Sequence, residues 1–272
     1  MNIFVSNNDF EVADCFFATS KYRPFIGISI GSTPPPLQKA VEILNWVLRS
    51  NSELIPILFA DDIAHINYRG LGYSSGKVLH QVESAKEKQL TLWNDALIHL
   101  TPEEKSRFRL ISWNEIVTDT FLAQQCIVRR AFAEEGRLYV AILWLVEQFI
   151  RSAGHTVSTK RCLGMVEYVI QELPLLLFGM ELDNVHYQMM LYPTYYTSEM
   201  LSFIAEIRRK PYFSDIIADL CDVNSLGYNK IIQMIVGERG AIKPNSNIIN
   251  SPMISEELSS KSKSDVELMY VC

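Results

Sequence analysis

The sequence has few of the patterns that mark metal-binding, secreted or membrane proteins. Its five cysteines are odd in number and include no Cys-x-x-Cys pair, and its five histidines lack metal-ligand spacing. The longest apolar run, 138–150, contains Glu147 and is shorter than the roughly 20 residues of a membrane-spanning helix. The first residues show no basic stretch followed by an apolar core, as a secretory signal would. These absences predict a cytoplasmic protein without a metal site, a disulfide framework or a membrane span.

An excess of positive charge is also missing. Lysines and arginines total 25, against 31 aspartates and glutamates, so the net charge is -6. Because phosphate contacts dominate affinity for nucleic acids, this balance argues against a surface that is basic throughout, although it permits a local patch. Four basic clusters occur, each of which alone is typical of a solvated face: Lys77 with Lys86 and Lys88; Lys105 with Arg107 and Arg109; Arg129-Arg130; and Arg208-Arg209-Lys210.

The spacing of apolar residues predicts one α/β domain. With 48% hydrophobic residues, a chain of this length can bury a substantial core. Strand-like and helix-like stretches alternate, as in a parallel sheet with helices on both faces. We expect strands at 25–30, 53–60, 107–113 and 185–192, helices at 37–48, 77–100, 114–134, 138–152, 159–180, 198–209 and 213–220, and a further apolar stretch at 230–236. Residues 1–238 should form the domain, followed by a polar, disordered tail at 239–272.

The first candidate for chemistry is Ser29, in the segment Gly27-Ile28-Ser29-Ile30-Gly31. This segment ends an apolar strand and precedes a helical pattern, so it predicts a tight turn that presents the serine hydroxyl. Three interpretations are open. The serine can be an acyl acceptor, it can merely end the strand, or the segment can be the Gly-x-Ser-x-Gly elbow of an α/β-hydrolase with His155 or His186 as base. Position argues against the hydrolase, because its elbow follows several strands.

A second candidate is the pair Tyr168 and Glu172, which are four residues apart and therefore share one face of a helix. Such a pair usually marks the edge of an amphipathic helix. Here the flanking residues are mostly apolar, and a buried carboxylate is costly unless it meets a cation or hydrogen-bond donors. An amino group of a substrate would be such a cation. Pro174 removes a backbone donor and is expected to open the helix beside the glutamate.

Taken with Tyr192-Pro193, these two segments resemble the cyclodipeptide synthases, which join two aminoacyl groups from charged tRNAs into a diketopiperazine. The family's marks are a Gly-x-Ser that closes the first core strand, a Tyr-(apolar)-x-x-Glu-(apolar)-Pro on a later helix, and a further tyrosine. Proline after that tyrosine, together with Ser32 where the other subfamily has asparagine, is similar to the Tyr-Pro subfamily. The match extends from about Phe25 to about Gly237.

The resemblance implies a Rossmann-like domain similar to the catalytic domain of class I aminoacyl-tRNA synthetases, without ATP chemistry or any cofactor. It implies two aminoacyl-tRNAs as substrates and leaves room for a downstream enzyme that modifies the product. The implied catalytic residues are Ser29 as acyl acceptor, Tyr168 and Glu172 as ammonium ligands, Glu172 also as base, and Tyr192 as proton relay. By offset, the implied pocket residues are Gly27, Phe25, Leu175 and Met190, and the implied tRNA-binding residues are Lys77, Lys86 and Lys88, interleaved here with acidic Glu83 and Glu87.

Other signals predict structural roles. Asp61-Asp62 follows a strand and favours capping or turn formation over metal binding, because adjacent side chains diverge and no third ligand is evident. The glycines of 70–76 are out of register for a dinucleotide site and favour a loop. Besides the synthase, the sequence leaves two functions open, a serine esterase and a non-catalytic module that binds tRNA or a small ligand.

Overall fold

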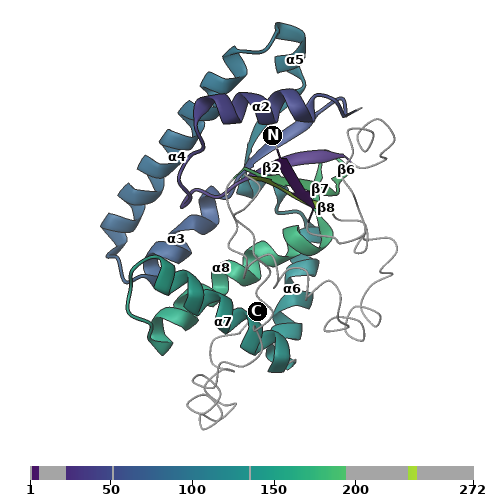
Figure 1. Cartoon of the computed structure of the whole chain (residues 1–272). Helices are drawn as coiled ribbons and strands as arrows, with labels where there is room; N and C mark the ends of the chain where they lie inside the picture. Colours follow the sequence, from purple (N-terminus) through teal and green to yellow (C-terminus); the bar gives the residue numbers. More distant parts are fainter. Residues whose placement is uncertain (1, 6–22, 51, 135, 194–231, 238–272) are drawn as a thin grey trace.

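A six-stranded sheet forms the centre of the protein (Figure 1). The computed structural model describes residues 2–5, 23–50, 52–134, 136–193 and 232–237. The strands follow the order β1-β8-β7-β2-β3-β4, and all neighbours are parallel except β1 and β8. Their bounds are Asn2–Val5 (β1), Ile232–Gly237 (β8), Met189–Tyr192 (β7), Pro24–Ile28 (β2), Ile55–Phe59 (β3) and Phe108–Ser112 (β4). The predicted α/β class with a parallel sheet is therefore confirmed.

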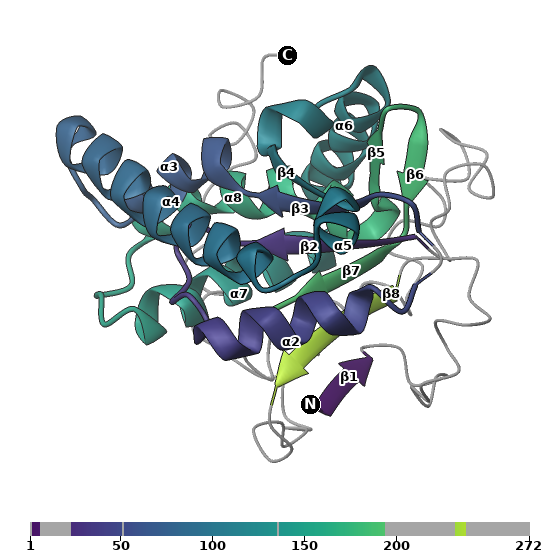
Figure 2. The same cartoon turned by 90° about the horizontal axis from the view of Figure 1, so that it is seen from above.

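Helices cover both faces of the sheet, and Figures 1 and 2 show α2 and α4 on one side and α6, α7 and α8 on the other. The helices are α2 (Leu37–Val47), α3 (Asp61–Gly70), α4 (Ser75–Ile98), α5 (Pro102–Ser106), α6 (Asp119–Glu134), α7 (Gly136–Ser152) and α8 (Thr159–Phe178), with a 3-10 helix η1 at Trp113–Ile116. No helix within the described ranges is long and apolar enough to cross a membrane.

The strand residues alternate between two hydrophobic cores. Phe25 and Leu58 pack with α6, α7 and α8, whereas Ile26, Ile28 and Ile57 pack with α2 and α4. This alternation follows from the two-residue period of a strand, and burial on both faces is typical of parallel sheets. The same period directs Phe25 and Gly27 toward α8, the helix that carries Tyr168 and Glu172.

Three parts of the fold differ from the sequence prediction. Residues 61–70 form α3, which was not expected, and β1 was not expected either. The strand predicted at 185–192 divides, because β6 (Val185–Tyr187) pairs with β5 (Met180–Leu182) in a separate hairpin and only β7 joins the main sheet. The turn of that hairpin has positive φ at Asp183 and Asn184, which suits a tight hairpin connection.

Most of the other predicted strands and helices agree with the structure, and the remainder fall outside the described residues. The strands at 25–30, 53–60 and 107–113 and the helices at 37–48, 77–100, 138–152 and 159–180 are confirmed to within about two residues. The predicted helix at 114–134 begins later, at Asp119, after η1, and the apolar stretch at 230–236 is strand β8. The predicted helices at 198–209 and 213–220 and the tail at 239–272 lie outside the described residues.

Asp61 joins three elements at the carboxyl end of β3. Its Oδ1 accepts hydrogen bonds from the backbone N–H groups of Asp62 and Trp113, each at 3.0 Å, and its Oδ2 lies 2.5 Å from Lys86 Nζ. The side chain is only 4% exposed, so α3, η1 and α4 meet on one buried carboxylate. Asp61 is the first residue of α3, whose N-cap is Ala60 without a side-chain cap hydrogen bond, so the carboxylate joins neighbouring elements rather than capping the helix as predicted.

We predict that Asp61→Ala lowers the free energy of unfolding by about 3 kcal/mol, because it leaves a buried N–H and an ammonium without their acceptor. Urea denaturation followed by circular dichroism measures the change. Asp62→Ala is the matched control: its side chain is exposed, and it should alter stability by about 0.5 kcal/mol or less. Equal effects of the two substitutions would contradict a joining role for Asp61.

Candidate active site

Ser29 directly follows β2 at the carboxyl edge of the sheet and begins a tight turn. Its carbonyl oxygen accepts two hydrogen bonds from Ser32, one from the backbone N–H at 3.2 Å and one from the hydroxyl at 2.7 Å. From β2 the chain continues through β3 to β4 on one side of the sheet, whereas β7 and β8 lie on the other side. The serine thus lies where the strand order reverses, which is the usual ligand-binding position in open α/β sheets.

Tyr168 brings the predicted catalytic residues together. Burial raises the pKa of its phenol well above the usual value, the nearby Glu172 and Tyr192 raise it further, and a side-chain hydrogen bond with Ser29 partly opposes them. The phenol is therefore neutral at physiological pH and can donate a hydrogen bond. Tyr192 is the last residue of β7 and follows Leu191, which pairs with Ile26 of β2, so Tyr192 and Ser29 lie at the same edge of the sheet. The fold thus brings Ser29 and Tyr192, more than 160 positions apart in sequence, into interaction with Tyr168 at one edge of the sheet.

Glu172 is buried, and the described residues provide it with no cationic partner. It is 8% exposed, and no ion pair of the described residues includes it. Burial raises the pKa of its carboxyl group from 4.5 to about 7. A group with such a pKa can accept and release protons near neutral pH, which suits a general base. Strongly perturbed pKa values of this kind cluster at functional sites.

The prediction that Pro174 opens helix α8 is wrong. The helix continues through it to Phe178. The proline removes the N–H that would bond the carbonyl oxygen of Ile170, but the surrounding turns are buried against the core and remain helical. Tertiary packing outweighs the local preference here, so Glu172 stands on a regular helix.

The four predicted pocket residues lie on the same side of the sheet as Tyr168. Phe25 and Met190 are paired across β2 and β7, and both pack with Leu175 in the core that includes α8. A side chain at Gly27 would collide with the terminal methyl of Met190, so glycine permits this close approach. The structure therefore brings Phe25, Gly27, Leu175 and Met190 into one apolar region on the side of the predicted catalytic residues.

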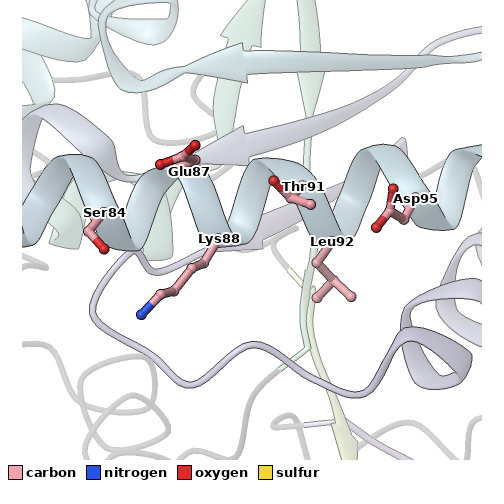
Figure 3. A pocket seen from close by; sticks show the side chains of 6 residues that line it. All are labelled: Ser84, Glu87, Lys88, Thr91, Leu92 and Asp95. Carbon is pink, nitrogen blue, oxygen red and sulfur yellow. The ribbon is translucent and has the colours of Figure 1, made fainter.

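The three predicted tRNA-binding lysines do not act alike on α4. Lys86 is bound by Asp61, as described above. Lys77 is exposed and lies over the Tyr73 ring, 4.4 Å from its centroid. Lys88 is exposed and lines a shallow depression along the helix, shown in Figure 3, with two carboxylates among its neighbours. The depression is lined by Ser84, Glu87, Lys88, Thr91, Leu92 and Asp95.

The other basic clusters are largely engaged within the protein. Arg107 donates hydrogen bonds to the carbonyl oxygens of Leu48, Ser50 and Ser52, which lie just after the end of α2. Arg109 pairs with Glu115 and Asp183, Arg129 with Glu167, and Arg130 with Glu134. Arg208-Arg209-Lys210 lies outside the described residues.

Neither histidine considered for a hydrolase serves Ser29 as a base. His186 Nε2 donates to the carbonyl oxygen of Phe178 at 2.7 Å, and the ring of His155 packs edge-on against Tyr73. Within the described part of the chain, the side-chain partner of Ser29 is Tyr168. Among the described residues, Ser29 therefore lacks the histidine partner on which hydrolases of this type depend.

Sequence reasoning did not single out Gln89, which bonds the turn after Ser29 from helix α4. Its Nε2 donates to the Ser32 carbonyl oxygen at 3.1 Å and lies 3.5 Å from the Ser32 hydroxyl. The available signal was a polar residue within the apolar stripe of α4, one helical turn before the buried Trp93.

Comparison with known proteins agrees with the family resemblance seen in the sequence. The family model for cyclodipeptide synthase matches residues 19–207, which is most of the chain. A comparison with curated proteins finds no significant match.

Solved structures share the fold at low sequence identity. A cyclo(L-leucyl-L-phenylalanyl) synthase has a TM-score of 0.62 at 16% identity, over 88% of this chain and 99% of the other. A cyclodipeptide synthase from Staphylococcus haemolyticus has a TM-score of 0.58 at 18% identity, with the same coverage. A Mycobacterium tuberculosis protein has a TM-score of 0.52 at 15% identity, over 70% of this chain and 78% of the other; its structure is described as demonstrating that cyclodipeptide synthetases are related to type I tRNA synthetases.

These likenesses agree with the predicted α/β fold class, a parallel sheet covered by helices. The family model covers the strand that leads to Ser29, the helix of Tyr168 and Glu172, and Tyr192. The chain belongs to the cyclodipeptide synthase family, and the protein is an aminoacyltransferase enzyme.

Proposed function

We propose that this protein joins aminoacyl groups from two charged tRNAs into a diketopiperazine, with Ser29 as the acyl acceptor. The observation that carries the proposal is the meeting of Ser29, Tyr168, Glu172 and Tyr192 at the carboxyl edge of the sheet. Tyr192-Pro193 and Ser32 support assignment to the Tyr-Pro subfamily. Residues 1–238 would form the catalytic domain.

In the first step the Ser29 hydroxyl attacks the ester carbon of an aminoacyl-tRNA. The bond to the tRNA ribose oxygen breaks, that oxygen takes up the serine proton, and an aminoacyl ester forms on Ser29. One ester replaces another of similar energy, so the step needs no nucleotide hydrolysis. The neutral phenol of Tyr168, bonded to Ser29, would keep the hydroxyl oriented for attack.

In the later steps the bound amino group becomes the nucleophile. Tyr168 and Glu172 would hold this ammonium, and the carboxylate would accept a proton from it. The free amine attacks the second aminoacyl ester, releasing the second tRNA and leaving a dipeptidyl ester on Ser29. The new terminal amine then attacks that ester, closing the ring and freeing Ser29, with Tyr192 returning a proton to the leaving serine oxygen.

The apolar region beside Ser29 supports binding of the first side chain. Phe25, Leu175 and Met190 are each at most 2% exposed, and the terminal methyl of Met190 occupies the space that a side chain at Gly27 would take. Met190 is the adaptable member, because an unbranched thioether can change rotamer to admit a substrate. An apolar or aromatic aminoacyl group suits such a lining.

We predict that bacterial cells expressing the protein release a diketopiperazine, and that Ser29→Ala abolishes it. Mass spectrometry of the medium measures the product. Incubation with aminoacylated total tRNA, followed by intact-protein mass spectrometry, should give an aminoacyl adduct on the wild type and none on the alanine variant. Ser32→Thr keeps a hydroxyl in the same turn and is the control. An adduct on the Ser29→Ala variant would place the acyl acceptor elsewhere, as would product formation without any adduct.

Glu172→Gln is predicted to increase stability while stopping product formation. The folded-state pKa of about 7 exceeds the ordinary 4.5, so between these values the folded state binds more protons and stability falls as pH rises. Above pH 7 the wild type therefore carries a penalty of about 3 kcal/mol, which is absent below about pH 4.5. Glutamine does not titrate, so the variant should be the more stable protein at pH 8 and show a flatter pH dependence in urea denaturation.

The same variant should accumulate aminoacyl-enzyme without diketopiperazine, because an amide cannot take a proton from the amine. Glu167→Gln on the same helix is the control for stability. Burial alone would raise the pKa of Glu167, but hydrogen bonds from Arg129 and Gln171 hold it below the usual value. Its loss should therefore destabilise the protein at neutral pH. Unchanged product formation by Glu172→Gln would exclude the carboxylate from the reaction.

A tRNA contact is predicted at Lys77 and Lys88. These exposed lysines are 11 residues apart and share one face of α4, about 16 Å apart along the axis, whereas Lys86 points the other way to Asp61. The double variant Lys77→Glu with Lys88→Glu should raise the charged-tRNA concentration needed for half-maximal acylation and reduce its dependence on salt. Lys105→Glu with Lys160→Glu changes the net charge equally and is the control. Equal effects of the two double variants would remove α4 as the docking face.

A further inference from the structure

Gln89 is the buried polar residue that reaches the nucleophile turn from the opposite face of the sheet. It lies on α4 and is 1% exposed, among the apolar side chains that fill the space between α2, α4 and the sheet. A buried amide is costly unless it is hydrogen-bonded. The two contacts of its Nε2, with the Ser32 carbonyl oxygen and hydroxyl, are therefore the feature that explains a glutamine here.

The direction of these hydrogen bonds is fixed by chemistry. The Ser32 carbonyl oxygen can only accept, so the amide must present its nitrogen to it. The Ser32 hydroxyl in turn donates to the Ser29 carbonyl oxygen at 2.7 Å. A chain of contacts thus runs from Gln89 through Ser32 to the backbone of Ser29.

Residues on one side of the sheet fix the main chain of Ser29, and Tyr168 on the other side contacts its hydroxyl. Ile28 and Ile30, its neighbours in sequence, are at most 3% exposed and pack on the α2–α4 side, where Gln89 also holds the turn. The Ser29 hydroxyl faces the other side and bonds Tyr168. Gly31, between the two serines, is exposed, and a Cβ there would meet no atom within 4 Å. Within this turn, the hydrogen bonds that Gln89 donates from α4 are made to Ser32, whereas Ile30 contributes apolar packing.

The second polar atom of Gln89 indicates what the residue contributes. Its Oε1 is buried and has no hydrogen-bond partner in the described part of the chain. Leaving a buried acceptor unsatisfied costs about 1–3 kcal/mol, comparable with what the bonds of Nε2 can return. An apolar side chain of similar size would therefore serve overall stability about as well. The amide's distinct contribution is to fix the geometry of the turn.

We propose that Gln89 is a positioning residue, which acts through Ser32 to hold Ser29 in register for acyl transfer. This inference rests on the proposed function, because it presumes that Ser29 is the acyl acceptor. A nucleophile must be held within about 0.5 Å of its productive geometry, and a misplacement of about 1 Å can slow a reaction 100-fold. The rate of acylation, rather than stability, is thus the property that Gln89 governs.

The test compares Gln89→Leu with Gln124→Leu, an identical change at another buried glutamine, on α6. Acylation is followed by intact-protein mass spectrometry in a single turnover with saturating aminoacylated total tRNA, and stability by urea denaturation. Gln89→Leu should slow acylation about tenfold or more, without a matching rise in the tRNA concentration required, while its urea midpoint stays near that of the wild type. Gln124→Leu should leave the rate unchanged.

A second pair of variants covers the case in which Gln89→Leu does not fold. Ser32→Ala removes the hydroxyl that links Gln89 to Ser29 and should slow acylation, whereas Ser32→Thr retains a hydroxyl and should restore it. The double variant Gln89→Leu with Ser32→Ala should be slowed less than the product of the single effects, because both act through one chain of contacts.

Wild-type acylation rates in Gln89→Leu, or equal rates in the alanine and threonine variants of Ser32, would overturn the positioning role. The absence of any adduct on the wild-type protein is a different result. It would reject Ser29 as the acyl acceptor, and with it the proposed function.

Discussion

The parallel pairing of β2 with β7 is the interaction on which the candidate site depends. Parallel strands place their carboxyl ends at the same edge of a sheet, so Ser29 after β2 and Tyr192 at the end of β7 meet there although they are far apart in sequence. The two-residue period of the strands then turns Phe25, Gly27 and Met190 toward helix α8. The predicted pocket residues and the proposed nucleophile thus share a single geometric origin.

Electrostatics distinguishes Glu172 from the other buried or half-buried carboxylates of the described residues. Asp61 is paired with Lys86, Glu147 with Arg151, and Glu167 with Arg129. Each of these acidic groups has a cation that offsets the cost of burial, and the pairs of Asp61 and Glu167 also join two helices. Glu172 has the burial without the cation, and its pKa rises to about 7. In the proposed function, a substrate ammonium would supply the missing charge.

The basic residues show the converse pattern. Arg107 donates hydrogen bonds to three carbonyl oxygens just after α2. Arg109, Arg129 and Arg130 each form an ion pair with a carboxylate. Among the described residues, these arginines, which appear in sequence as possible phosphate-binding patches, therefore bind groups of the protein itself. This use of positive charge is consistent with the net charge of -6 and leaves a sparse basic surface on α4.

The sequence by itself determined the alternation of strands and helices, the turn after Ser29 and the shared helical face of Tyr168 and Glu172, because these depend on local periodicity and spacing. It also carried the family resemblance. Tertiary structure decided the rest. Whether 61–70 is helical, whether Pro174 interrupts α8 and how 185–192 divides between two sheets depend on packing against distant elements. The pairing of Lys86 with Asp61 and the reach of Gln89 to Ser32 join residues 25 and 57 positions apart, and no local pattern encodes such contacts.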